Sequence, residues 1–355
     1  MKELTMNEER AHARAEAAPT ALGDFGEGMR RVLVCLDRTE LGERVLPYAL
    51  SLARTWDSEV TLLHVLEPVR PGMVHQPADA LDWQVARTEA EKYLEQERER
   101  VRHSELVVET RLVQGYAAEQ ILSVIEEERV DLAVLASHGE HGFGGWDLGT
   151  TTQKVASLAP CSLLLVPASC PPQPSPMVHF ARVVVPLDGS RRAECVLPVA
   201  ERIARFYRSE FLLLHVVPTP EIGMPAHATG TIQDLAAELE RANWAAAEAY
   251  IGELRARMAV EGLEVRTLIL RDADVREALI HAPEREGADL VVLAAHGHTG
   301  SCDVPYGSHA RHLVAHGSIP LLLIQDVCPA ERGWRAARES GRSSPFAGLH
   351  REGHM

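Results

Sequence analysis

Apolar runs alternate with amphipathic stretches along the chain, and this alternation predicts strands that alternate with helices. Residues 31–36 and 60–66 are continuous apolar runs, which are typical of strands buried on both faces of a parallel sheet. Between them, residues 43–56 carry apolar side chains at three- and four-residue spacing, so we expect an amphipathic helix. Strand–helix–strand units of this kind form parallel sheets with right-handed crossovers.

The alternation continues through the first half of the chain. It predicts, in order, a charged helix over 83–103, a strand over 106–113, a helix over 117–128, a strand over 132–136, a glycine-rich loop leading to a helix after Gly149, and a strand over 162–166. The first half therefore contains the elements of an α/β domain.

The same pattern then occurs a second time, which indicates a duplicated domain. Residues 32–37 (VLVCLD) match residues 183–188 (VVVPLD) at an offset of 151 residues. Beyond residue 80 the offset grows, because Gly139 corresponds to Gly297, 158 residues later. The second half thus carries about seven extra residues, which we expect in a surface loop between its second strand and the next helix.

The length of 355 residues suits two domains of ordinary size with tails. A proline-rich segment between the repeats predicts a semi-rigid linker. The predicted organisation is a flexible N-terminal segment at 1–28, a first domain at 29–167, the linker at 168–179, a second domain at 180–326 and a flexible tail at 327–355.

Charge and composition narrow the classes of function. The formal net charge of −15 argues against sequence-independent binding of nucleic acid, but a helix N-terminus can still hold one nucleotide. The N-terminus lacks the apolar core of a signal peptide, and no apolar run is long enough to span a membrane. The six cysteines include no CxxC pair, as expected of reduced thiols. We therefore expect a cytoplasmic protein.

Acidic residues and glycines follow matching strands in both halves. Asp37 and Asp188 follow the first strand of each repeat, and Gly139 and Gly297 follow the fourth. In an open parallel sheet, ligands bind beyond the carboxyl ends of the strands where the strand order reverses, and these two strands flank such a point. The carboxylates are placed to accept hydrogen bonds from ribose hydroxyls, and the glycines allow a phosphate to approach the backbone.

A second glycine opens the next helix in each half. Gly149-Thr150 and Gly307-Ser308 stand where free backbone N–H groups point out of a helix start. The hydroxyls there can cap the helix or contact a phosphate. Each part alone is more often a turn former or a helix cap, but the repeated set in the same order favours a nucleotide site.

These residues carry a resemblance to tandem universal stress proteins with two UspA-type domains, over about residues 30–167 and 180–326. The family's nucleotide motif is Gly-x2-Gly-x9-Gly-Ser/Thr after an Asp that ends the first strand. In the first domain it covers Asp37, Ala136, Gly139, Gly149, Thr150 and Thr151, and in the second Asp188, Ala294, Gly297, Gly307 and Ser308. The resemblance also implies adenine contacts for Val65, Val216 and Pro186.

The resemblance implies a fold and a role. Each domain is expected to be a Rossmann-like open parallel five-stranded sheet flanked by helices, with strand order 3-2-1-4-5. The two domains are expected to pair through their last strands, 162–166 and 320–324, as an intrachain pseudo-dimer, with a homodimer left open. The implied ligand is ATP, with Mg²⁺ optional, bound in at least one domain of a stress-response regulator.

The sequence departs from the family motif at two kinds of position. The first glycine of the motif is Ala136 in one half and Ala294 in the other, and the added methyl would crowd a ribose or phosphate. The Asp-Gly-Ser turn of residues 188–190 is Asp-Arg-Thr at residues 37–39. Two alternatives therefore stay open: a scaffold whose nucleotide sites have decayed, and a slow ATP hydrolase.

Other chemistry has little support. We find no nucleophile–base pair, and neither glycine loop contains a lysine for the γ-phosphate, so rapid phosphoryl transfer is not expected. The seventeen histidines include no Cys/His spacing typical of a metal site. For His64 and His215, which end buried strands, we expect a hydrogen-bonded role in the core.

Overall fold

The computed structural model describes residues 28–68, 80–137, 149–219, 230–260, 262–297 and 306–325. The elements of the first half alternate as the sequence predicts. They are β1 (Arg31–Leu36), α2 (Glu40–Glu43), α3 (Val45–Trp56), β2 (Glu59–Leu66), α4 (Ala80–Arg100), a short 3-10 helix (Arg102–Ser104), β3 (Val108–Gln114), α5 (Ala117–Glu127), β4 (Leu132–Ala136), α6 (Thr150–Leu158) and β5 (Ser162–Val166).

The second half repeats this order. Its elements are β6 (Arg182–Pro186), the 3-10 helix η2 (Ala193–Val196), α7 (Leu197–Tyr207), β7 (Glu210–Pro218), α8 (Gly230–Val260), β8 (Val265–Asp272), α9 (Val275–Arg285), β9 (Leu290–Ala294), α10 (Ser308–His316) and β10 (Leu321–Ile324).

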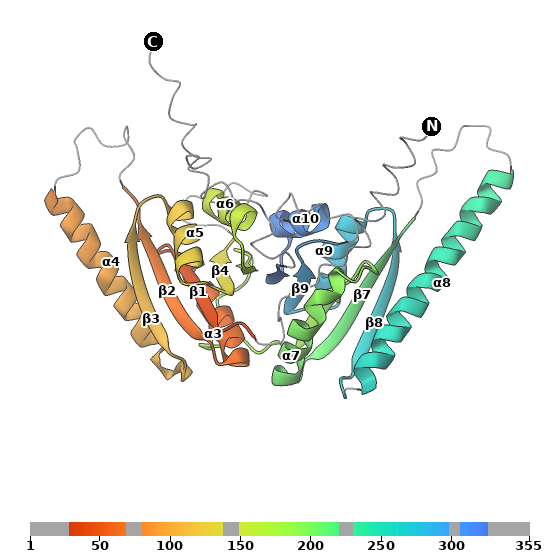
Figure 1. Cartoon of the computed structure of the whole chain (residues 1–355), viewed down its shortest axis with the longest axis horizontal. Helices are drawn as coiled ribbons and strands as arrows, with labels where there is room; N and C mark the ends of the chain where they lie inside the picture. The colour runs from red at the N-terminus through yellow and green to blue at the C-terminus, as the bar shows by residue number, and fades with distance from the viewer. Residues whose placement is uncertain are drawn as a thin grey trace, which may run out of the picture.

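The ten strands in the described part of the chain belong to one sheet, in the order β3-β2-β1-β4-β5-β10-β9-β6-β7-β8 (Figure 1). Counted from the outer edge of the sheet toward its centre, each half has the predicted strand order 3-2-1-4-5. The strands within each half are parallel. The last strands, β5 and β10, pair antiparallel, with Leu164 opposite Leu322. The predicted pseudo-dimer is confirmed, with one difference: the two five-stranded sheets join into a continuous mixed sheet.

Helices cover both faces of the sheet and enclose two cores. One core lies under α3, α4, α7 and α8 and includes Leu50, Leu94 and Ile203. The other lies under α5, α6, α9 and α10 and includes Ile125, Val155 and Leu313. Inner strands such as β1 and β5 are buried on both sides, which explains why they read as continuous apolar runs. The edge strands β3 and β8 are mostly half-buried or exposed.

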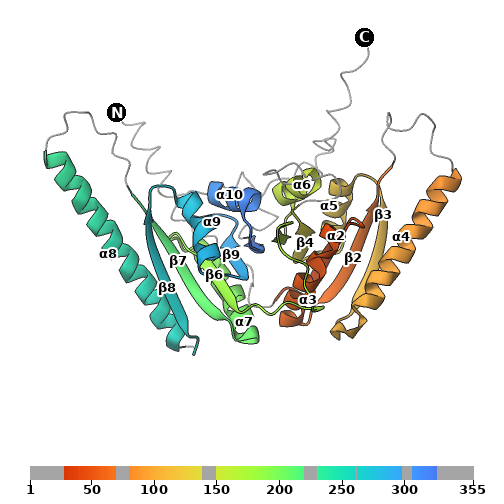
Figure 2. The same ribbon diagram turned by 180° about the vertical axis from the view of Figure 1, so that it is seen from behind.

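A second contact joins the two halves through α3 and α7, which lie side by side near the middle of the molecule (Figure 2). Arg202 of α7 donates from Nε to the carbonyl of Thr55 at 3.0 Å. The hydroxyl of Tyr207 donates to the carbonyl of Ser51 at 2.7 Å. The pairing therefore rests on helices as well as on strands.

The segment between β5 and β6 also contacts α3. The backbone N–H of Val178 donates to the hydroxyl of Ser51 at 2.7 Å, and Arg44 donates to the carbonyl of Ala168 at 3.0 Å. Proline stiffness and these bonds together hold the connection against the first half.

Two local expectations differ from the structure. The helix expected over 43–56 is present as α3, but a separate short helix, α2, which Thr39 caps, precedes it and was not expected from the sequence. The extra residues of the second half were expected in a loop, but α8 has 31 residues and α4 has 21, so they lengthen a helix. The alanine-rich sequence of α8 favours this outcome, since alanine has the highest helix propensity.

Candidate functional site

The two aspartates stand in turns of the same geometry at the carboxyl ends of β1 and β6. Asp37 Oδ1 accepts hydrogen bonds from the backbone N–H of Thr39 at 3.1 Å and from its hydroxyl at 2.6 Å. Asp188 Oδ1 accepts the same two bonds from Ser190, at 3.0 and 2.6 Å. Each carboxylate thereby has one oxygen occupied by its own turn and is fixed in direction.

The departure at residues 37–39 leaves this turn intact. Gly189 has φ of +84°, a left-handed conformation that suits glycine, and Arg38 adopts φ of +66° at the corresponding place. Holding a non-glycine residue there costs roughly 1–3 kcal/mol. The first half tolerates that cost and keeps the same hydrogen bonds, so the exchange of Gly-Ser for Arg-Thr does not displace Asp37.

Glycine lets each carboxylate lie against a neighbouring backbone. A side-chain carbon at Gly297, after β9, would overlap Asp188 Oδ2, and one at Gly42, in α2, would overlap Asp37 Oδ1. The sequence motif led to Gly297 but missed Gly42, whose counterpart in the second half is Ala193. Among the described residues, Asp188 therefore lies against Gly297 and Asp37 against Gly42.

The helix-opening glycines are tied to the ends of the fourth strands. The N–H of Gly149 donates to the carbonyl of Ser137 at 2.9 Å, and the N–H of Gly307 donates to that of Ala295 at 2.7 Å. In the first half the hydroxyl of Thr152 adds a bond to the carbonyl of Ala136 at 2.8 Å. These bonds hold the starts of α6 and α10 at the carboxyl edge of the sheet.

The first turns of α6 and α10 offer donors to an anion. No described side chain caps either helix. Thr150 and Ser308 are exposed, and Thr151 is half-buried. A helix start of this kind carries a partial positive charge, which favours phosphate.

The residues expected to contact adenine end the neighbouring strands. Val65 and Val216 lie near the ends of β2 and β7, against the core covered by α5, α6, α9 and α10. Pro186 is the last residue of β6 and is buried. All three are at the same carboxyl edge as the aspartates, on strands that neighbour or carry them.

The two alanines of the motif are oriented toward the opposite core. Ala294 is 6% exposed and belongs to the core under α3, α4, α7 and α8, and Ala136 packs against that core. Their methyl groups therefore contribute to packing. Gly139, the counterpart of Gly297, lies outside the described residues.

One titratable residue at this edge was not assigned to the nucleotide site from the sequence. His309, the second residue of α10, interacts electrostatically with Asp188, Asp274, Arg276 and His312. Burial of part of its ring lowers the pKa of His309, while the charge of Asp188 acts in the opposite direction. Its counterpart in the first half is Thr151, so a motif defined by residues common to both halves does not include His309.

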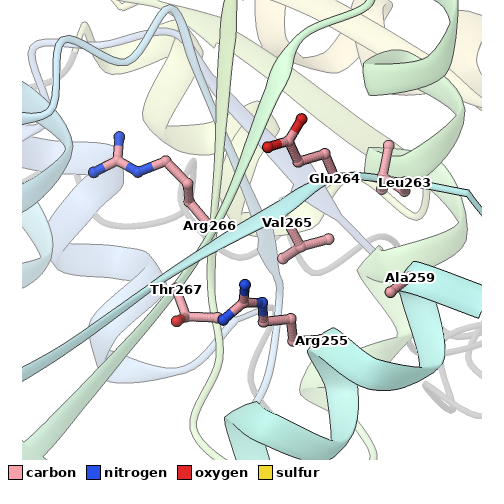
Figure 3. Close-up of a pocket in the computed structure, with 7 residues that line it drawn as sticks. All are labelled: Arg255, Ala259, Leu263, Glu264, Val265, Arg266 and Thr267. Carbon is pink, nitrogen blue, oxygen red and sulfur yellow. The ribbon is translucent and has the colours of Figure 1, made fainter.

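A surface hollow of about 370 Å³ lies away from this edge, between the end of α8 and the start of β8 (Figure 3). Arg255 extends beside Thr267, whereas Arg266 projects away from it and pairs with Glu210 and Glu286. Since β8 begins here, the hollow is at the amino edge of the parallel strands.

The described residues contain neither a candidate metal site nor a candidate membrane-spanning helix. No group of three or more His, Cys, Asp or Glu side chains there could hold a metal ion. Within the same part of the chain, no helix has the length and apolar character needed to cross a bilayer.

Comparisons with known proteins match both halves. The profile of the Universal stress protein family matches residues 28–167 and 179–325. The universal stress protein YxiE of Bacillus subtilis is 30% identical over 144 residues, which is 38% of this chain and 97% of that protein. A universal stress protein of Archaeoglobus fulgidus, 18% identical, covers 84% of this chain and 99% of its own, with a TM-score of 0.61.

One further universal stress protein was solved in complex with cAMP; it covers 40% of this chain and 98% of its own at 18% identity, with a TM-score of 0.32. The A. fulgidus structure supports the fold, and the family profile matches well over half of the chain, once in each half. The chain therefore belongs to the universal stress protein family and carries two of its domains in tandem.

Proposed function

We propose that this protein binds an adenine nucleotide, ATP, in at least one of its two domains and acts in the stress response as a nucleotide-dependent regulator. The ribose would be held by Asp37 or Asp188, and the phosphates by the first turn of α6 or α10. The base would lie near Val65 or Val216.

One observation carries the proposal: the Asp188 carboxylate lies against Gly297, at the edge where the start of α10 is fixed and no described side chain caps it. An acceptor for ribose hydroxyls and donors for phosphates are thus combined at the switch point of a parallel sheet. The absence of a Cβ at Gly297 is what permits this approach. The first half repeats the carboxylate and the helix start.

The decayed-site alternative depends on the alanines of the motif. Because Ala294 is nearly fully buried in the core, its methyl is accounted for by packing. This favours a functional site over a decayed one. The slow-hydrolase alternative has no lysine or arginine in either glycine loop to support it, and a turnover of about one per second or faster would contradict our proposal.

Thermal unfolding of the full chain with ATP, with and without Mg²⁺, tests the proposal. Ligand at about a hundred times its dissociation constant stabilises the occupied domain by about 2.7 kcal/mol. We expect a shift that is reduced by Asp188→Asn and Asp37→Asn but not by Asp57→Asn. Asp57 ends α3 in a left-handed conformation that asparagine also adopts, so this control matches the charge change.

Absence of a shift at millimolar ATP, in protein shown to be folded, would favour the scaffold alternative. A shift in the unfolding temperature with cAMP but not with ATP would mean that the same site binds cAMP instead of ATP. The cytoplasmic location and a homodimer expected from the sequence stay predictions.

A further inference from the structure

Two histidines are bonded to the backbone immediately before the two aspartates. His64 Nδ1 lies 2.8 Å from the carbonyl oxygen of Leu36, the residue before Asp37. His215 Nδ1 lies 2.8 Å from the carbonyl oxygen of Leu187, the residue before Asp188. The same bond, at the same distance, thus ends the first strand of both domains.

The sheet itself explains why a side chain is needed here. Leu36 is the last residue of β1 and pairs with His64 in register. In the second half, the N–H of Leu187 still donates to the carbonyl of Leu214 at 2.9 Å, but β6 has already ended. A backbone carbonyl beyond the ladder requires another donor when it is buried, and the imidazole supplies it.

Aromatic contacts hold the imidazoles in place. The ring of Tyr93, from α4, meets the ring of His64 edge-on at a centroid distance of 6.0 Å. The ring of Tyr250, from α8, meets that of His215 at 6.1 Å. Helices α4 and α8 differ in length, yet both place a tyrosine against the histidine.

The bond also defines the form of the imidazole. A carbonyl oxygen only accepts, so Nδ1 must carry the proton. Burial lowers the pKa of His64, which favours the neutral ring. The neutral Nδ1–H tautomer is the one that this contact selects.

We propose that His64 and His215 are positioning residues of the nucleotide sites, which direct Asp37 and Asp188 toward the ribose hydroxyls. The direction of each carboxylate depends on the path of the backbone into its turn, because Thr39 or Ser190 binds only one of its oxygens. Fixing the preceding carbonyl fixes that path. This inference rests on the proposed function and adds a determinant of selectivity for ribonucleotides over nucleotides without ribose hydroxyls.

Two paired substitutions separate positioning from packing. Asparagine places its amide nitrogen where histidine has Nδ1, and glutamine places its amide nitrogen close to the position of Nε2. The double variant His64→Asn/His215→Asn should therefore keep the bond to the carbonyls, and His64→Gln/His215→Gln should lose it. Calorimetric titration with ATP and with 2′,3′-dideoxy-ATP measures the result in the full chain.

We expect the asparagine variant to retain ATP affinity within about threefold and the glutamine variant to lose on the order of tenfold. Affinity for dideoxy-ATP should change little in both, so the preference for the ribose diol should fall only with glutamine. Equal ATP affinities in the two variants, or equal losses for ATP and dideoxy-ATP, would overturn the positioning role while leaving the proposed function intact. Absence of ATP binding by the parent protein would overturn both.

A measurement on the parent protein does not depend on the variants folding. Nitrogen-15 NMR of labelled histidine distinguishes the two neutral tautomers. Both His64 and His215 are expected to carry the proton on Nδ1. Assignment of His64 and His215 to the Nε2–H form would contradict the inference.

Discussion

The Asp188 carboxylate occupies the space that a side chain at Gly297 would need, so these two residues are matched across the carboxyl edge of the sheet. The two come from the ends of β6 and β9, which are neighbours in the sheet. The contact therefore depends on the strand order, and it explains why glycine is required where the backbone conformation alone does not require it.

Gly297→Ala should displace Asp188 and weaken ATP binding in the second domain by roughly tenfold or more. Calorimetry in an Asp37→Asn background isolates that domain. Gly252→Ala is the matched control, because a side-chain carbon there meets no atom within 4 Å. It should leave affinity unchanged and stabilise α8 by about 0.5–1 kcal/mol. Equal affinities for ATP in the two variants would contradict the role given to Gly297.

Ala294→Gly should leave ATP affinity within about threefold of the parent and destabilise the second domain. The loss of a buried methyl costs about 0.8 kcal/mol, and glycine in a strand adds about 0.5–1 kcal/mol. Chemical denaturation and ATP titration measure the two effects. An affinity gain of about tenfold would mean that the methyl limits the site, as the decayed-site alternative requires.

ATP binding in the second domain should strengthen as pH falls. The pKa of His309 is held low in the free protein, mainly by burial, and phosphates at the start of α10 would raise it. Binding then takes up a proton, so affinity increases as pH falls through the pKa of His309 in the complex, and it levels off below the pKa of the free protein, which is lower than the ordinary histidine value of 6.5. For each unit by which ATP raises the pKa of His309, the affinity for ATP can increase by at most about tenfold.

Titrations in the Asp37→Asn background, compared with the same protein carrying His309→Thr, isolate this effect from the titration of ATP itself. Threonine is the residue at the corresponding position of the first domain. A pH dependence that is the same with and without His309 would exclude it from the phosphate end of the site.

Because the two halves pair through β5 and β10, substitutions at Leu164 and Leu322 should have non-additive effects on the free energy of unfolding. Both are fully buried and stand opposite each other across β5 and β10. Each alanine substitution should cost about 2–5 kcal/mol, and the double variant should deviate from additivity by about 0.5–3 kcal/mol. Denaturant unfolding measures the cycle. Additivity within about 0.3 kcal/mol would indicate that the two leucines are not in contact.

Much of the fold follows from local pattern, because strands buried on both faces produce continuous apolar runs and a duplication shows each run twice. The extra residues of α8 were misplaced, since an insertion in an alignment does not reveal whether it extends a helix or a loop. A helix propensity count over this alanine-rich stretch would have favoured the helix.

The site was predictable only where the two halves agree. Gly42 was missed because its counterpart is Ala193, and His309 because its counterpart is Thr151. The hydrogen-bonded role expected of His64 is confirmed, but the identity of its acceptor required the register of β1 against β2. Long-range contacts of this kind depend on strand order, which no local pattern contains.

Equilibrium dialysis with labelled ATP tests the central claim most directly. The parent chain should retain at least one ATP per molecule, and a chain carrying both Asp37→Asn and Asp188→Asn should retain far less at the same free concentration. Retention of no ATP at millimolar ligand by the folded parent, or equal retention by the parent and the double variant, would contradict nucleotide binding at these two edges.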